Sequence, residues 1–308
     1  MSYESELLRL CESDPRIVVM TAENRAAIRN LPDILGPRFL DVGICEMTMV
    51  GMAAGLALRG RIPVIHALAT FLTLRAFEFI RTDVGIARLP VKLIGAVPGF
   101  LSDGNGPTHQ ALEDVALMRG IPGMSVVCPA DEEELVAALP DIIRMPGPVY
   151  VRYNARPAAV QHQRPYAIGE GEVLATGDDV TLLTYGLLVE EAARACGILE
   201  AQGYGVTLIN LRTLAPLDAA LILRWARATK LVVTIEDHFR IGGLSSMVTE
   251  TLFAARVQTP VLAISMDERW FHPALLPDVL AHEGFDGPQL AERVRAAIGG
   301  DAWRTASA

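Results

Sequence analysis

Short apolar runs alternate with longer helical patterns along the first half of the chain. The apolar runs predict strands at residues 17–20, 63–68, 91–97, 125–128 and 149–153. The stretches between them predict helices at residues 46–58, 72–87 and 132–144. Asp131 precedes the last helix and Glu134 stands three residues later, which is the spacing of a capping box. Continuous apolar strands separated by helices indicate a parallel sheet that is covered on both faces.

The same alternation returns after a polar segment. Residues 154–166 (NARPAAVQHQRPY) show no periodicity, so we expect a linker there. Beyond it the pattern predicts strands at 180–185, 206–211, 231–236 and 261–266, and helices at 188–201, 217–228, 242–255 and 287–297. The predicted fold class is therefore α/β, with two tandem three-layer domains at residues 1–155 and 168–300 and mostly parallel sheets. Residues 299–308 are expected to form a loose tail.

The composition argues against several classes of protein. A chain of 308 residues that is 51% hydrophobic can bury two cores. A net charge of −9 argues against binding to nucleic acid or to an anionic membrane surface. The longest nearly uncharged apolar run, residues 47–58, is shorter than the roughly 20 residues that a membrane span needs. The first ten residues are polar and acidic and lack the order of a secretory signal.

Four cysteines are scattered along the chain, in apolar surroundings and without CxxC spacing: Cys11, Cys45, Cys128 and Cys196. This pattern predicts four buried free thiols in a reducing cytoplasm. The chain also lacks HxH, HExxH and clustered carboxylates, so we predict no metal site on it.

Glu46 is the first candidate for chemistry, because it begins a helix among apolar neighbours such as Ile44. A carboxylate at a helix N-terminus is often only a favourable contact with the helix dipole. The alternative is a carboxyl group that is held in an apolar wall and shares a proton with a ligand, which requires desolvation to outweigh the dipole. The pattern leaves both interpretations open.

The loop at residues 99–110 (GFLSDGNGPTHQ) is the second candidate. It follows a predicted strand, and ligands of open α/β sheets bind at the carboxyl ends of strands. His109 is the histidine of this loop, and it could bind a ligand or cap the next helix, at 111–120. The glycines match neither GxGxxG nor the Walker spacing, so they indicate a turn-rich loop.

Three further groups of polar or aromatic residues are ambiguous. Phe71, Phe77 and Phe79 have the helical spacing of core residues. Arg152 ends a predicted strand and could bind a carboxylate or phosphate as a fork, or pair with a surface acid. Glu236, Asp237 and His238 precede a glycine pair and could serve a site or an interface.

Read in order, six segments resemble the C-terminal half of transketolases: GICEMTMVGMAAGLA, TFLTLRAFEFIRTDV, DGNGPTHQALED, CPADEEEL, VYVRYN and TIEDHFRIGGLSSMV. The first and third segments resemble 1-deoxyxylulose-5-phosphate synthase equally closely. The resemblance covers nearly the whole chain. It implies a pyrimidine-binding domain of a thiamine diphosphate enzyme, followed by a transketolase C-terminal domain.

The resemblance also implies roles for individual residues. Glu46 is expected to bond N1′ of the cofactor's aminopyrimidine, and Glu46 and His109 to be catalytic. Further cofactor contacts are expected from Phe71, Phe77 and Ile44. Substrate contacts are expected from His109, Arg152, Asn105 and Asp103.

Some positions depart from the family pattern. Transketolases usually have an aspartate at Asn105, a phosphate-binding histidine near Val97 and another aromatic residue at Leu74. Glu23 aligns where a serine often faces the substrate phosphate, and a carboxylate there repels phosphate. The resemblance therefore supports ketol transfer better than a sugar-phosphate substrate, and an unusual ketose is our expectation.

The chain lacks the family's diphosphate motif, in which an asparagine follows GDG by roughly 25–30 residues and binds Mg²⁺. After Asp103-Gly104, the first asparagine beyond Asn105 is Asn154. We therefore expect a split transketolase, in which a separate N-terminal subunit holds the diphosphate and Mg²⁺ and the two subunits form α2β2. Three alternatives stay open: the β subunit of a 2-oxo acid dehydrogenase E1 component, a deoxyxylulose-phosphate-synthase-like carboligase, and a non-catalytic scaffold subunit. The first is disfavoured, because E1 β subunits typically have an HSQSPE-like segment where this chain has GPTHQALED.

Overall fold

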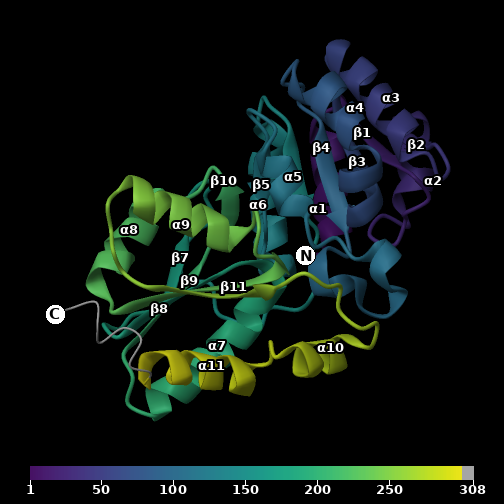
Figure 1. The fold of residues 1–308 in the computed structure, drawn as a ribbon. Coiled ribbons are helices and arrows are strands. Elements are labelled where there is room, and N and C mark those ends of the chain that lie inside the picture. The colour runs from purple at the N-terminus through teal and green to yellow at the C-terminus, as the bar shows by residue number, and fades with distance from the viewer. Residues whose placement is uncertain (300–308) are drawn as a thin grey trace.

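A computed structural model describes residues 1–299, which form two α/β units joined by residues 153–171 (Figure 1). In Figure 1 the first unit runs from purple to teal and the second from teal through green to yellow. The α/β fold class with two mostly parallel sheets is confirmed. The predicted tail falls outside the described residues except for Gly299, which ends the last helix. No helix among residues 1–299 is long and apolar enough to cross a membrane.

The first sheet has seven strands in the order β10-β5-β6-β4-β3-β1-β2. Six of them come from the first unit and pair in parallel: β1 (Ile17–Thr21), β2 (Phe39–Asp41), β3 (Ile62–Leu68), β4 (Lys92–Ala96), β5 (Ser125–Val127) and β6 (Val149–Arg152). The seventh, β10 (Thr213–Ala215), comes from the second unit and runs antiparallel to β5. The two units therefore share a sheet, which the pattern of strands did not predict.

Helices cover both faces of this sheet, as its continuously buried strands require. The helices of the unit are α1 (Tyr3–Ser13), α2 (Leu31–Leu35), α3 (Glu46–Leu58), α4 (Phe77–Phe79), α5 (Asp114–Arg119) and α6 (Glu132–Arg144). One face buries α1 and α6, and the other buries α3, α5 and residues 71–85. The Asp131 side chain caps α6 by accepting the Glu134 N–H, as the capping-box spacing predicts.

The helix predicted at 72–87 is interrupted. The short α4 is flanked by two π-helical segments, Phe71–Arg75 and Ile80–Gly85. Four residues spaced by four are buried along it: Leu72, Ala76, Ile80 and Val84. That spacing suits α-helical and π-helical turns alike, so the apolar pattern could not distinguish them. π-helical turns are frequent at functional sites.

The second unit holds a five-stranded sheet in the order β12-β11-β8-β9-β7. Its strands are β7 (Glu172–Ala175), β8 (Val180–Thr184), β9 (Val206–Asn210), β11 (Leu231–Phe239) and β12 (Val261–Met266), all parallel except β7. Its helices are α7 (Val189–Ala201), α8 (Ala219–Ala228), α9 (Leu244–Ala254), α10 (Leu276–Glu283) and α11 (Gly287–Gly299). Figure 1 shows α8 and α9 on one face and α7 and α11 on the other.

Several details differ from the predictions. The helix expected at 111–120 begins only at Asp114, and β11 extends to Phe239. Cys45 is exposed, because it precedes α3 at the surface, so only three of the four thiols are buried. The pattern also missed the following short or terminal elements: α1, α2, β2, β7, β10 and α10. The domain boundaries at 155 and 168 stay a prediction.

Candidate active site

A recess of about 350 Å³ lies at the carboxyl ends of two neighbouring parallel strands, β1 and β3. Residues 22–26, which follow β1, form one side of it, and Leu68 at the end of β3 and Phe71 form another. Ile44 and Glu46, at the start of α3, complete the wall. Strand ends of an open α/β sheet are the usual place for a ligand.

Glu46 lies in this wall with only 2% of its surface exposed. It is the first residue of α3, and the turn before it passes through Gly43 at a φ of 71°, a conformation that favours glycine. Its Oε2 accepts a hydrogen bond from Arg75 Nη1 at 2.9 Å. The expectation of a carboxyl group withdrawn from water therefore agrees with the geometry, and the carboxylate also has a charged partner.

Arg75 connects Glu46 to the aromatic side of the site. Its guanidinium carbon lies 4.2 Å from the centre of the Phe71 ring, a cation–π distance. The Phe71 ring in turn meets the His109 ring edge to face, with centroids 5.0 Å apart. Glu46, Phe71 and His109 therefore lie in one connected group. The sequence analysis missed Arg75, although a cation four residues after Phe71 in a mostly apolar segment was a usable signal.

The loop that carries His109 begins with strained backbone. Val97 has a φ of 48°, which is unusual for a β-branched residue, and Asp103 has a φ of 21°. Such conformations persist where the surrounding structure holds them, often at functional sites. His109 Nδ1 lies 2.9 Å from Thr108 Oγ1. Asn105 donates to the Ser102 carbonyl and Asp103 accepts from the Gly104 N–H, so both side chains bond within the loop.

The remaining predicted contacts, Ile44, Phe77 and Arg152, differ in their position relative to the recess. Ile44 borders the recess and is 67% exposed. Phe77 does not border it, because its side chain packs against the core of the sheet. The role of Arg152 as a substrate-phosphate ligand stays a prediction, and its guanidinium is already paired with two carboxylates. It is buried between Asp114 (Nε–Oδ2, 2.9 Å) and Asp237 (Nη1–Oδ1, 2.6 Å), which occupy its fork.

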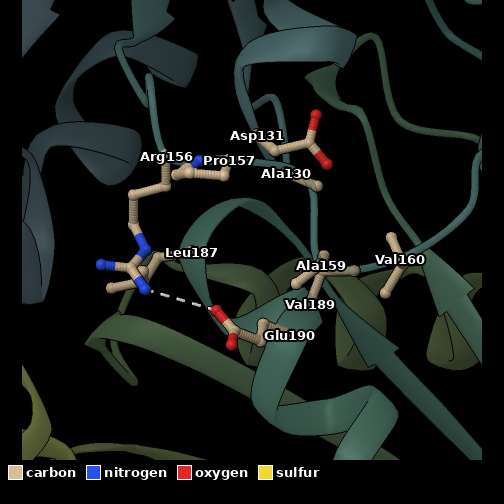
Figure 2. A pocket seen from close by; sticks show the side chains of 9 residues that line it. All are labelled: Ala130, Asp131, Arg156, Pro157, Ala159, Val160, Leu187, Val189 and Glu190. Atoms are coloured by element: carbon tan, nitrogen blue, oxygen red, sulfur yellow. Dashed lines mark hydrogen bonds and ion pairs between the residues drawn. The ribbon is translucent and has the colours of Figure 1, made fainter.

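A second hollow lies near the linker, between the two units (Figure 2). Its volume of about 10 Å³ suits a single water molecule. Arg156 of the linker pairs across it with Glu190 of α7 at 3.4 Å. We assign this hollow to the contact between the units rather than to catalysis.

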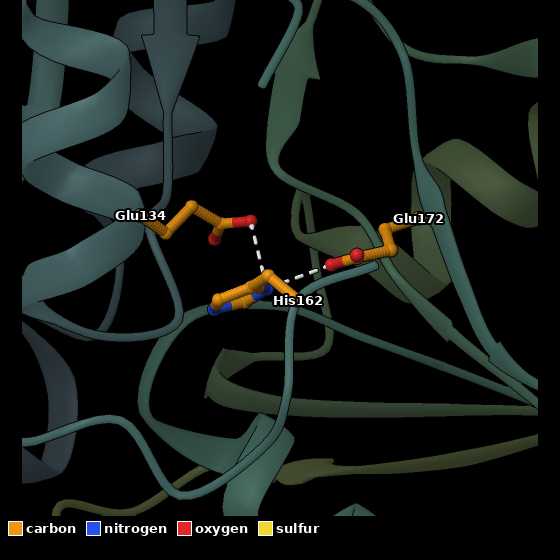
Figure 3. A group of neighbouring side chains, drawn as sticks. All are labelled: Glu134, His162 and Glu172. Atoms are coloured by element: carbon orange, nitrogen blue, oxygen red, sulfur yellow. Dashed lines mark hydrogen bonds and ion pairs between the residues drawn. The ribbon is translucent and has the colours of Figure 1, made fainter. Parts of the chain in front are cut away.

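Glu134, His162 and Glu172 each have one possible metal-ligand atom within 4.8 Å of the others. Figure 3 shows the three side chains facing one another. Arg212 occupies the same cluster, with Nε 2.6 Å from Glu134 Oε1 and Nη2 2.7 Å from Glu172 Oε2. Hydrogen bonds from the imidazole to Asp131 and Glu172 raise the pKa of His162 to about 10. Arg212 and the charged His162 already pair with these carboxylates, so we interpret the cluster as an ion-pair network that joins the linker to both units.

Comparisons with known proteins match the whole arrangement. Residues 1–158 match the transketolase pyrimidine-binding domain, and residues 169–290 match the transketolase C-terminal domain. The chain is 39% identical over 255 residues to the 6-deoxy-6-sulfo-D-fructose transketolase subunit SqwH of Clostridium sp., with 82% of this chain and 79% of that protein aligned.

Two further similarities define the extent of the match. A 1-deoxy-D-xylulose-5-phosphate synthase of Synechococcus sp. is 37% identical over 300 residues, and the match covers 95% of this chain but only 46% of that enzyme. A solved structure described as a split gene transketolase, inactive beta4 tetramer, superposes with a TM-score of 0.85 at 32% identity over 96% of each chain. With both of its domains matched in order, this chain belongs to the transketolase family of thiamine diphosphate enzymes.

Proposed function

We propose that this chain is the C-terminal subunit of a split transketolase. In this proposal it transfers a two-carbon ketol group from a ketose to an aldehyde after a partner subunit has bound. The observation that carries the proposal is the buried Glu46 carboxyl group, which shares a recess with the Phe71 ring at the start of α3.

The recess fits the aminopyrimidine half of thiamine diphosphate. A ring that carries hydrogen-bonding nitrogens needs one buried polar partner and an apolar face, and Glu46 and Phe71 supply these. Ile44, at the border of the recess, is 67% exposed, which leaves room for the rest of the cofactor to extend toward another polypeptide. We expect that polypeptide to provide the diphosphate and Mg²⁺ ligands, since Mg²⁺ requires oxygen ligands around phosphate.

Each residue then has a definite task. When bound, thiamine diphosphate supplies a nucleophilic ring carbon and an electron sink. Glu46 holds a proton between its carboxyl oxygen and the pyrimidine N1′ and keeps it from water. Phe71 covers one face of the ring. His109, in edge contact with Phe71, bonds the hydroxyl and carbonyl end of the substrate.

We propose a sulfonated ketose as the donor. One relative, 39% identical, is named for 6-deoxy-6-sulfo-D-fructose. Glu23 lines the recess, and its negative charge repels a phosphate, which carries a charge of about −1.5 to −2, more strongly than a singly charged sulfonate. Val97, where transketolases place a phosphate-binding histidine, offers no side-chain donor.

The test is to co-express this chain with a partner that carries GDG and a downstream asparagine. We expect an α2β2 assembly by light scattering, tight binding of thiamine diphosphate, and ketol transfer from 6-deoxy-6-sulfofructose in preference to xylulose 5-phosphate. The chain alone should bind the cofactor poorly and be inactive. High activity of the chain alone would contradict the proposal.

The similarity to 1-deoxy-D-xylulose-5-phosphate synthase favours a second candidate, a carboligase that joins a 2-oxo acid to an aldehyde. The same assembly distinguishes the two functions. Release of CO₂ from pyruvate together with carboligation, without ketol transfer, would replace the first proposal by the second.

A further inference from the structure

We propose that Asp237, in the second unit, is a positioning residue that holds the loop at residues 99–110 and thereby orients His109 for ketol transfer. The proposal rests on the proposed function of His109. The attachment of the loop to Asp237 is a property of this chain alone and can be measured separately.

Asp237 bonds the loop directly. It lies at the carboxyl end of β11 and is fully buried. Its Oδ2 accepts the backbone N–H of Phe100 at 3.3 Å, and its Oδ1 lies 2.6 Å from Nη1 of Arg152. One carboxylate therefore contacts both the start of the loop and the end of β6.

Arg152 anchors Asp237 to the first unit. Its Nε bonds Asp114 Oδ2, which also accepts the hydroxyl of Tyr150 at 2.6 Å. Separating the members of a buried ion pair is costly, because each charge would be left uncompensated away from water. Arg152 therefore fixes the position of the Asp237 carboxylate. Burial, which is the largest influence, raises the pKa of Asp237, and Arg152 opposes that shift.

Gly99 shows how closely the loop approaches this carboxylate. A Cβ atom at Gly99 would lie 1.9 Å from Asp237 Oδ2, and the residue has a φ of 54°. Both observations require glycine at this position. The backbone at 99–100 therefore fits the carboxylate without spare room.

The second unit also holds the loop at its other end. The Gln110 side chain donates to the Phe271 carbonyl at 2.9 Å, and the Phe239 N–H donates to the Leu112 carbonyl at 2.7 Å. Phe100 and Leu112 belong to the hydrophobic core of the second unit. His109 thus lies between two points that the second unit attaches, one at Phe100 and one at Gln110.

This arrangement matters for catalysis because a displacement of about 1 Å can cost about a hundredfold in rate. Asp237→Asn has nearly the same shape, but its NH₂ group must face either Arg152 or the Phe100 N–H. One of the two contacts then becomes donor against donor. We expect the loop to loosen while Glu46 and Phe71 keep their places, since neither touches Asp237.

The experiment compares the wild type, Asp237→Asn and a control, Asp267→Asn, each assembled with the partner subunit. Asp267 pairs with Arg240 at the surface, with both side chains exposed. Hydrogen exchange is measured for peptides 99–112 and 46–58. Kinetics are measured at saturating thiamine diphosphate, with 6-deoxy-6-sulfofructose and xylulose 5-phosphate as donors.

We expect Asp237→Asn to exchange at least about tenfold faster in 99–112 but not in 46–58. Its kcat should fall about a hundredfold with cofactor affinity unchanged, and the control should match the wild type. Unchanged exchange in 99–112 would overturn the attachment. Faster exchange with a wild-type kcat would show a merely structural role and overturn the positioning. If the wild-type enzyme transfers no ketol group, the proposed function is refuted, and with it the role of Asp237 in that transfer. The hydrogen-exchange rates of peptide 99–112 would still decide whether Asp237 holds the loop.

Discussion

Arg75 Nη1 lies 2.9 Å from Glu46 Oε2, which joins a half-exposed guanidinium to a carboxylate that is almost fully buried. The same guanidinium stacks on Phe71, a ring that borders the recess. Arg75 therefore contacts both groups that we expect to receive the pyrimidine.

A double-mutant cycle measures the energy of this pair. Glu46→Gln, Arg75→Met and the double variant should give a coupling free energy of about 1 kcal/mol in urea unfolding, because one partner is buried but the other is partly screened by water. The exposed pair Arg144–Asp141 is the control, and its coupling should stay below about 0.5 kcal/mol. Equal coupling free energies in the two pairs would mean that the burial of Glu46 does not strengthen its interaction with Arg75.

Phe71 and Phe77 offer a matched comparison of two aromatic residues. Only Phe71 borders the recess, whereas Phe77 packs against the core. Phe71→Leu should weaken thiamine diphosphate binding to the assembled enzyme by about tenfold, the upper range for loss of one aromatic pairing. Phe77→Leu should leave the affinity unchanged in isothermal titration. The reverse order would restore the predicted role of Phe77 as a cofactor contact.

Gly99 and Gly197 test the close approach of the loop to Asp237. Gly99→Ala should lower the free energy of unfolding by more than about 2 kcal/mol, since the added Cβ collides with the carboxylate and the φ is positive. Gly197 lies in α7 with open space around it, and Gly197→Ala should raise stability by about 0.5–1 kcal/mol. A neutral Gly99→Ala would contradict the geometry of the loop.

His162 should make the chain sensitive to alkaline pH. Its pKa is raised from 6.5 to about 10 in the folded chain by hydrogen bonds to Asp131 and Glu172. The stabilisation is therefore complete below pH 6.5 and is lost as the pH rises through about 10. Chemical unfolding at several pH values should show the wild type losing this advantage over His162→Gln across that range. A constant difference between the two proteins would contradict the charged form of His162.

The strands of the fold were predictable because their apolar runs are continuous and bounded by turn residues. Short elements were not. β10 has three residues and is recognisable only by its antiparallel pairing with β5 of the other unit. The π-helical turns at 71–85 escaped prediction because the buried positions, four residues apart, suit both kinds of helix.

Some residues of the candidate site were also recognisable from the sequence, and others were not. The pattern made Glu46 and His109 candidates, because they lie at a helix start and after a strand end, but only the resemblance to transketolases gave them roles. The guanidinium of Arg152 is paired with Asp114 and Asp237, which are 38 and 85 residues away in the chain. No local pattern reveals that these two carboxylates converge on one guanidinium, so its fork appeared to be available.

The most direct measurement is the turnover of Glu46→Gln assembled with its partner subunit. The amide keeps the shape of the side chain but cannot exchange a carboxyl proton with the pyrimidine. We predict normal assembly by light scattering and a kcat for ketol transfer that is at least about a hundredfold lower than in the wild type. Wild-type turnover by the assembled Glu46→Gln enzyme would contradict the central claim that this carboxyl group activates the cofactor.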